Sequence, residues 1–99
     1  MDGDREITDG KVAKYLDLTA RALEKLKLAP PAPSHLRDVA DDFLTMARSY
    51  HADARSFAAR GDLVNAFACV NYAHGWLDAG ARLGLWDVGG DDVLFTLSK

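Results

Sequence analysis

Apolar residues recur at three- and four-residue steps along three stretches of the chain, which is the spacing of one face of an α-helix. We predict helices at about residues 7–27, 34–60 and 62–84. The repeating positions of the first stretch are Val12, Leu16, Thr19, Leu23 and Leu26. Those of the second are Leu36, Ala40, Phe43, Ala47, Tyr50, Ala54 and Phe57, opposite a charged and hydroxyl-bearing face. These two stretches are typical of amphipathic helices that pack on one side.

The third stretch has apolar side chains around most of its circumference. Its main apolar stripe consists of Leu63, Phe67, Val70, Ala73 and Leu77, and a second stripe consists of Cys69, Tyr72, Trp76, Ala79 and Leu83. A helix of this kind is contacted from two or more directions. We therefore expect it to pack against both other helices, and it also offers a surface for a second copy of the protein.

Short breaker sequences separate the three helices. The prolines of "APPAPS" at 29–34 end the first helix, and Ser34 is a good N-cap for the second. In the "RGD" turn at 60–62, Gly61 suits a left-handed C-terminal position and Asp62 an N-cap. Both connections are too short to separate domains. The sequence therefore predicts an all-α fold, a small antiparallel three-helix bundle with a spectrin-like or helical-hairpin core, over residues 1–88.

Residues 89–99 have a different character. They continue the turn-like "DVGGDD", after which Val93, Phe95 and Leu97 alternate with other side chains. This weak period-two pattern is compatible with a short strand or an extended segment. We expect a flexible or packed C-terminal tail.

Two glycines lie inside the third helix, where each costs about 1 kcal/mol relative to alanine. Counting outward from the turn at 60–62 places Gly75 level with Ala47, and Tyr72 level with Tyr50. We predict that Gly75 lies at a tight crossing with the second helix. Tyr72, Trp76 and Trp86 are expected mostly in the core, and Gly84 at the end of the third helix.

A set of polar side chains on the second and third helices forms the candidate site. It consists of Arg48, Tyr50, Asp53, Asn71, His74 and Asp78. Asn71, His74 and Asp78 share a helix face and could form a small polar pocket for an anionic ligand or a metal. The alternative is structural: a half-buried His74 bonded to Asp78, with ordinary surface ion pairs. One histidine and one aspartate supply two ligands where a metal site uses three or four, so we predict no metal and no cofactor.

The composition of the chain and the absence of known catalytic motifs exclude several classes of function. The 99 residues are 48% hydrophobic and carry a net charge of −3, which is not the electrostatic pattern of a protein that binds nucleic acid or anionic membranes. There is neither a signal peptide nor a membrane-length apolar run, and the single Cys69 suits a reducing compartment, so we expect a cytoplasmic protein. No phosphate loop, cysteine pair or His-Glu-x-x-His motif is present, and we predict no catalytic residues.

Most of the chain, from the first helix to Leu85, resembles the archaeal family of domains of unknown function called DUF357. That family shares a Tyr-x-x-Asp-Ala on one helix, a Gly-Asp turn, and then a Tyr-Ala-x-Gly-x-Leu-Asp. The matching residues are Tyr50, Asp53, Ala54, Gly61, Asp62, Tyr72, Ala73, Gly75, Leu77 and Asp78. The resemblance implies a compact all-α fold in archaea and no known activity. The helical hairpin is also faintly similar to HEPN domains, but it lacks the Arg-x4-6-His motif of their RNases.

The function that we expect is a non-enzymatic one. The nearly all-round apolar third helix favours a module that self-associates or docks on a partner protein. The alternative is a domain that binds a small ligand or a metal through the polar set.

Overall fold

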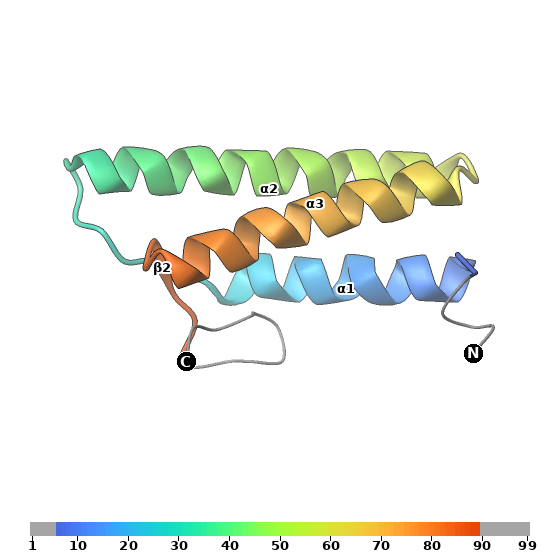
Figure 1. Ribbon diagram of the computed structural model, residues 1–99, viewed down its shortest axis with the longest axis horizontal. Helices are drawn as coiled ribbons and strands as arrows, with labels where there is room; N and C mark the ends of the chain where they lie inside the picture. Colours follow the sequence, from blue (N-terminus) through green and yellow to red (C-terminus); the bar gives the residue numbers. More distant parts are fainter. Residues whose placement is uncertain (1–5, 90–99) are drawn as a thin grey trace.

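Three helices make up most of the molecule, and the all-α bundle is confirmed. The computed structural model describes residues 6–89, so the predicted strand-like segment at 93–97 lies outside the described residues. The helices are α1 (Asp9–Lys25), α2 (His35–Ala59) and α3 (Leu63–Arg82), and the strands are β1 (Lys27–Leu28) and β2 (Trp86–Asp87) (Figure 1). Each helix begins and ends within about two residues of its predicted limits.

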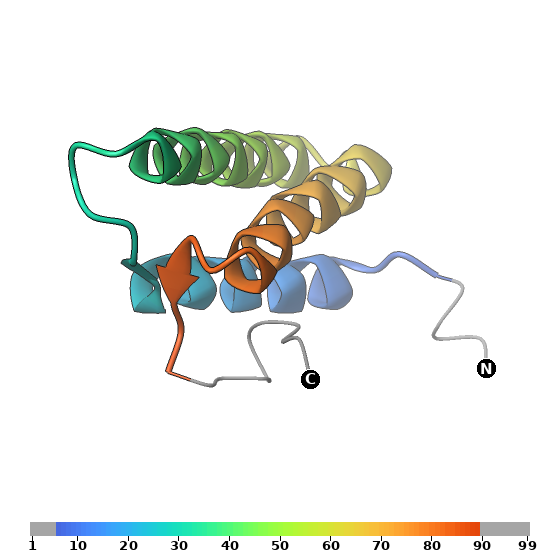
Figure 2. The ribbon, with the colours of Figure 1, turned by 60° about the vertical axis from the view of Figure 1, so that its left-hand side comes forward.

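The third helix lies between the other two, as its apolar circumference predicts. α2 and α1 lie on opposite sides of α3, which crosses them at a tilt (Figures 1 and 2). Most of its packing is against α2, and the rest is mainly against α1. Its buried residues are Ala66, Val70, Ala73, Leu77 and Gly80. No helix within residues 6–89 has the length and apolar character that a membrane crossing requires.

The helix ends follow the local chemistry of the sequence. The side chains of Thr8, Ser34 and Asp62 accept hydrogen bonds from backbone N–H groups three residues later, at 3.1, 3.1 and 3.2 Å. These bonds satisfy donors that have no partner inside the helix. Gly61 and Gly84 have φ angles of 78° and 76°, in the left-handed region that glycine adopts without strain. The caps predicted at Ser34 and Asp62 and the helix ends predicted at Gly61 and Gly84 are therefore confirmed.

A short strand pair joins the end of α1 to the segment after α3. Lys27 pairs with Asp87 and Leu28 with Trp86 in antiparallel register, and the Ala29 N–H donates to the Leu85 carbonyl at 3.0 Å. The prediction that the first helix extends to Lys27 was wrong, since Lys27 lies in β1. The chain turns extended at Leu26, with φ −65° and ψ 148°, a few residues before the prolines. The pairing brings Leu85, Trp86 and Val88 into the core and leaves Asp87 exposed.

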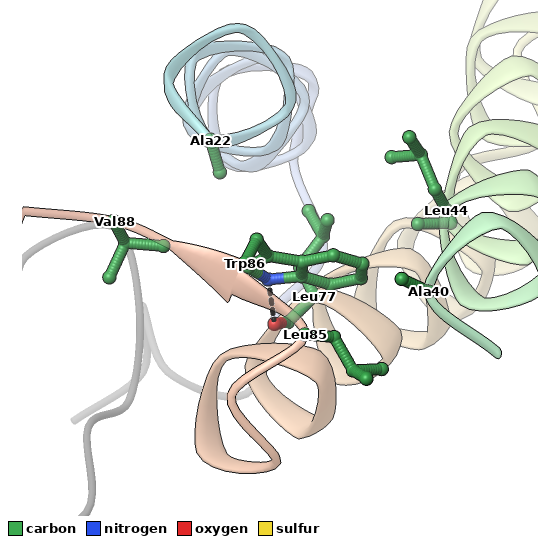
Figure 3. Packing of buried hydrophobic residues seen from close by; sticks show 8 residues of the cluster. Ala22, Ala40, Leu44, Leu77, Leu85, Trp86 and Val88 are labelled. Atoms are coloured by element: carbon green, nitrogen blue, oxygen red, sulfur yellow. Dashed lines mark hydrogen bonds between the residues drawn. The ribbon is translucent and has the colours of Figure 1, made fainter. Parts of the chain in front are cut away.

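Trp86 is the largest side chain of that core and is 3% exposed. Its indole Nε1 donates to the Leu77 carbonyl at 3.1 Å, and its ring lies among side chains from all three helices (Figure 3). Ala22 of α1 and Ala40 of α2 are fully buried beside it and leave room for the ring. Burying a tryptophan stabilises a fold by on the order of 4 kcal/mol.

The two glycines of α3 have different surroundings from those predicted. A Cβ at Gly80 would overlap the six-membered ring of Trp86, whereas a Cβ at Gly75 would meet nothing within 4 Å. The predicted tight crossing at Gly75 was therefore wrong, and the close approach is at Gly80. Tyr72 is 63% exposed rather than part of the core, although it is level with Tyr50 as predicted.

We predict that an alanine substitution has opposite effects on stability at Gly80 and at Gly75. Gly80→Ala is expected to lower the free energy of unfolding by about 1–3 kcal/mol, because the methyl group displaces the Trp86 ring. Gly75→Ala is expected to raise it by about 0.5–1 kcal/mol, because alanine favours the helix and the position is open. Denaturant unfolding of both variants at dilute protein concentration measures this. Equal shifts in the two variants would contradict the assignment of Trp86 to Gly80.

Candidate functional site

His74 occupies the middle of α3 on the side that faces α1. Its Nδ1 lies 3.3 Å from the hydroxyl of Thr19 on α1, and its Nε2 lies 3.6 Å from Oδ1 of Asp78, one turn further along α3. Thr19 is 1% exposed, and the His74 and Asp78 side chains are 28% and 23% exposed. The imidazole is therefore hydrogen-bonded through Nδ1 to a buried hydroxyl, and its Nε2 faces a half-buried carboxylate.

The contacts favour one arrangement of protons on this group. A threonine hydroxyl can donate one hydrogen bond, and the neutral imidazole offers one acceptor nitrogen. With Thr19 donating to Nδ1, the proton on Nε2 faces the carboxylate of Asp78. This tautomer satisfies the Thr19 contact and turns an N–H group toward Asp78.

A pocket of about 340 Å³ opens beside this group, between α1 and α3. Its lining residues are Tyr15, Leu18, Asn71, His74, Gly75 and Asp78. Asn71, His74 and Asp78 line it together because steps of three and four residues share one helix face. The structure thus brings these three predicted site residues to one cavity, and Tyr15 and Leu18 complete it from α1.

The three predicted residues of α2 do not line this pocket. Tyr50 stacks on Tyr72 with ring centroids 5.4 Å apart, while Arg48 and Asp53 are exposed. The charge of Asp53 acts on Cys69, a neighbour on another face of α3. The polar set predicted from the sequence is therefore not brought together in one place, since only its three α3 members line the pocket.

The residue types at the pocket include those of a hydroxyl–histidine–aspartate catalytic triad, but the geometry does not fit one. A nucleophile has to reach the substrate, and the Thr19 hydroxyl is buried between two helices. Thr19 therefore positions the imidazole and does not attack a substrate. The pocket can hold a ligand and does not supply this nucleophile.

The ligand types at the pocket also do not make a metal centre. Among residues 6–89, no group of three or more His, Cys, Asp or Glu side chains could hold a metal ion. His74 and Asp78 provide two such ligands, and the remaining polar neighbours are an amide and a phenol. A structural or catalytic metal uses three or four protein ligands.

His51 is a buried polar residue that the sequence analysis missed. It is 8% exposed, and its Nε2 donates to the Leu16 carbonyl at 3.1 Å, which links α2 to α1. The sequence did contain a signal for this burial. His51 lies four residues after Ala47 and three before Ala54, so it falls on the buried face of α2. A buried histidine that lies among apolar residues and donates to a backbone carbonyl has a structural role.

The only cysteine, Cys69, has a raised pKa. Burial is the largest cause, and the negative charges of Asp53 and Asp62 add to it. The neutral thiol is the less reactive form, so Cys69 is not an activated nucleophile. Because its folded-state pKa lies above its unfolded value, its stabilising contribution is lost as the pH rises through the folded pKa.

The comparison with protein families gives one match. The model of the family described as "Protein of unknown function (DUF357)" matches residues 14–86. The match spans most of α1, all of α2 and α3, and ends at Trp86. No curated protein and no solved structure matched the chain.

Removing the hydroxyl that orients His74 tests the geometry of the site. We expect Thr19→Val to lower the free energy of unfolding by about 1–2 kcal/mol, because the buried imidazole nitrogen loses its donor. The ¹⁵N shifts of the His74 ring should move as the tautomer preference weakens. Thr45→Val is the matched control, since the exposed Thr45 hydroxyl bonds only its own helix, at the Asp41 carbonyl. An unchanged His74 ring spectrum would count against the Thr19 contact.

The thiol of Cys69 reports whether Asp53 lies where the structure puts it. Asp53→Asn removes a negative charge, which lowers the pKa of Cys69 and increases its thiolate fraction at about pH 8. Alkylation by iodoacetamide should therefore be faster than in the unchanged protein. Asp42→Asn, an exposed carboxylate elsewhere on α2, is the control and should leave the rate unchanged. Equal rates for the two variants would refute the electrostatic assignment.

Proposed function

The chain belongs to the DUF357 family, and we propose that it is a non-enzymatic, self-associating helical module whose copies pair through α3. The observation that carries the proposal is a row of exposed apolar side chains along this helix, with the exposed Asn65 and Arg82 at its two ends. Soluble monomers rarely leave long contiguous apolar surfaces in water. A second copy of the chain would cover this one.

This face, here called the α3 strip, consists of the half-buried Ala79 and five exposed residues, Val64, Ala68, Tyr72, Gly75 and Leu83. Val64, Tyr72 and Leu83 are 67%, 63% and 64% exposed. Their spacing of three and four residues keeps all six on one side of the helix. A shallow depression of about 300 Å³ in the middle of the strip is lined by Asn71, Tyr72, Gly75, Trp76 and Ala79. The strip therefore has both protruding side chains and a hollow to receive them.

The order of large and small residues in the strip suits pairing with itself. If two copies cross antiparallel about a two-fold axis near Gly75, Tyr72 lies opposite Ala79 of the second copy. The same axis places Ala68 opposite Leu83. Large side chains then meet small ones in both pairs, as interdigitated packing requires. A two-fold axis also closes the assembly at two copies.

The exposed Gly75 has no packing role within its own chain. A glycine inside a helix costs about 1 kcal/mol relative to alanine, and here no neighbouring atom lies where a side chain would go. Close approach of a second helix backbone would offset this cost. The α3 strip alone is about 30 Å long and about 10 Å wide, or about 300 Å² per copy. Two copies would bury about 600 Å² in total through the strip, which is below the range of stable specific interfaces, so we expect a weak, concentration-dependent dimer.

The chemistry of the remaining surface supports a protein partner in the cytoplasm. A net charge of −3 disfavours nucleic acid and anionic membranes as partners. Cys69 is a free thiol, which suits a reducing compartment. A second copy of the chain is the partner for which the strip itself provides a complementary surface.

A charge placed in the strip should prevent pairing. We expect the unchanged protein to shift from monomer to dimer over about two decades of concentration in sedimentation velocity. Ala68→Arg should remain monomeric because its guanidinium would face the apolar Leu83 of the second copy. Ala52→Arg is the matched control, since Ala52 is an exposed alanine on α2 outside the strip. A monomer at every concentration, or the same loss of dimer in both variants, would refute the proposal.

A further inference from the structure

We propose that the second copy pairs with α2 as well as with the α3 strip, and that this brings Asp42 of each copy beside Asp53 of the other. The proposal rests on the pairing through the α3 strip. It adds a set of like charges that opposes pairing and keeps the dimer weak. Self-association then responds to the charge and the salt around this part of α2.

The apolar surface of the strip continues onto α2. Four half-buried residues at steps of four, three and four share one side of this helix and are here called the α2 flank: Val39, Phe43, Met46 and Tyr50. The ring of Phe43 lies edge-on to Trp76, which lines the depression in the strip, with centroids 4.8 Å apart. Tyr50 stacks on Tyr72 of the strip. The α2 flank and the α3 strip therefore adjoin each other.

The α2 flank supplies interface area that the strip alone lacks. It spans residues 39–50, or about 18 Å of a helix that is about 10 Å wide, and so adds about 200 Å² per copy. Together with the strip, two copies then bury about 1,000 Å² in total, which is the minimum expected of a specific interface. A second copy that covers both surfaces therefore accounts for a dimer better than one that covers the strip alone.

A two-fold axis near Gly75 sets α2 of one copy against α2 of the other. The turn at 60–62 makes α2 and α3 antiparallel neighbours (Figures 1 and 2). An axis that lies in the interface, perpendicular to α3, keeps α2 on the same side of both copies and reverses its direction. Tyr50 and Tyr72 stack at one level of the hairpin, and counting three residues from each places Gly75 level with Ala47. The axis therefore turns α2 end for end about a point near Ala47.

Asp42 and Asp53 lie at nearly equal distances from that point. They are eleven residues apart, which is about three helical turns, so they share one side of α2. That side adjoins the α2 flank, because Asp42 comes one turn before Met46 and Asp53 one turn after Tyr50. Turning α2 about Ala47 places Asp42 within one turn of Asp53 of the second copy, and the symmetry repeats this pair.

The two carboxylates have no compensating charge of their own. Both are exposed, and neither forms an ion pair with a lysine or an arginine among residues 6–89. Within one chain they are about 16 Å apart along the helix, beyond the Debye length of about 8 Å at physiological salt, so they interact little. In the dimer each gains a like charge as a neighbour, which opposes pairing.

Reversing the charge at position 42 tests this contact by sedimentation velocity. Asp42→Lys turns both repulsive pairs into attractive ones, so the dissociation constant of the dimer should fall about tenfold. Asp41→Lys is the matched control, because it makes the same change in net charge at an exposed residue on the opposite side of α2 from the flank. Equal changes in the two variants would overturn the proposal. Far-UV circular dichroism of the dilute proteins checks that both variants remain folded.

A second charge reversal distinguishes a direct contact from an effect of net charge. Asp42→Lys combined with Asp53→Lys puts like charges opposite each other again, so this dimer should be about as weak as that of the unchanged protein. Each replacement adds two positive charges to the net −3 of the chain, so the single variant carries −1 and the double variant +1. Net charge alone therefore predicts equal pairing of the single and double variants, and that result would refute the contact.

The response to salt gives an independent readout. Salt screens repulsion in the unchanged protein and attraction in Asp42→Lys, so raising the salt should strengthen the first dimer and weaken the second. The same response in both would count against the contact. A protein that stays monomeric at every concentration overturns the pairing itself. A dimer that Ala68→Arg prevents and Asp42→Lys leaves unchanged keeps the α3 strip as the interface and overturns the part assigned to α2.

Discussion

The packing of Trp86 on Gly80 is the contact on which the arrangement of the bundle depends. The ring occupies the space that a side chain at Gly80 would take, and its Nε1 donates to the Leu77 carbonyl. It fills the region where α1, α2 and α3 meet, beside Ala22 and Ala40. The small residues around it are therefore explained by one large side chain that comes from outside the helices. Without that ring, the ends of α1 and α3 would enclose a cavity, which protein cores rarely tolerate.

Much of the fold was predictable because its determinants are local. Helix periodicity, the caps at Ser34 and Asp62, and the left-handed glycine at Gly61 each depend on residues within a few positions of one another. The strand pair and the role of Gly80 were not predictable in this way. Both depend on contacts between residues that are distant along the chain, and the two residues of β1 carry no strand signal of their own. Gly75 illustrates the same limit of prediction from sequence. Periodicity shows that this glycine lies inside a helix, where it lowers stability, but it does not show which residue lies opposite it.

Part of the candidate site was predictable because it too depends on local spacing along one helix. Helical spacing placed Asn71, His74 and Asp78 on one face of α3, and the structure brings them to one pocket. Which neighbour that face meets depends on the rotation of α3 about its axis, and the sequence pattern leaves this angle open. The partners predicted from the sequence lie on α2, whereas Thr19 and Tyr15 of α1 are the residues that meet the face. Thr19 occurred only as a member of an apolar repeat, where a hydroxyl gives no sign of its partner.

The strand pair between Lys27–Leu28 and Trp86–Asp87 has a consequence for the order in which the chain folds. The α2–α3 hairpin is closed by a three-residue turn, so its loop entropy is small and it can form early. The strand pair closes a loop of about sixty residues, and Trp86 can dock only when both ends of that loop have met. We expect the seam between β1 and β2 to order late and to open first under denaturing conditions. The backbone amides of residues 27–29 would then exchange with solvent sooner than those in the middle of α3.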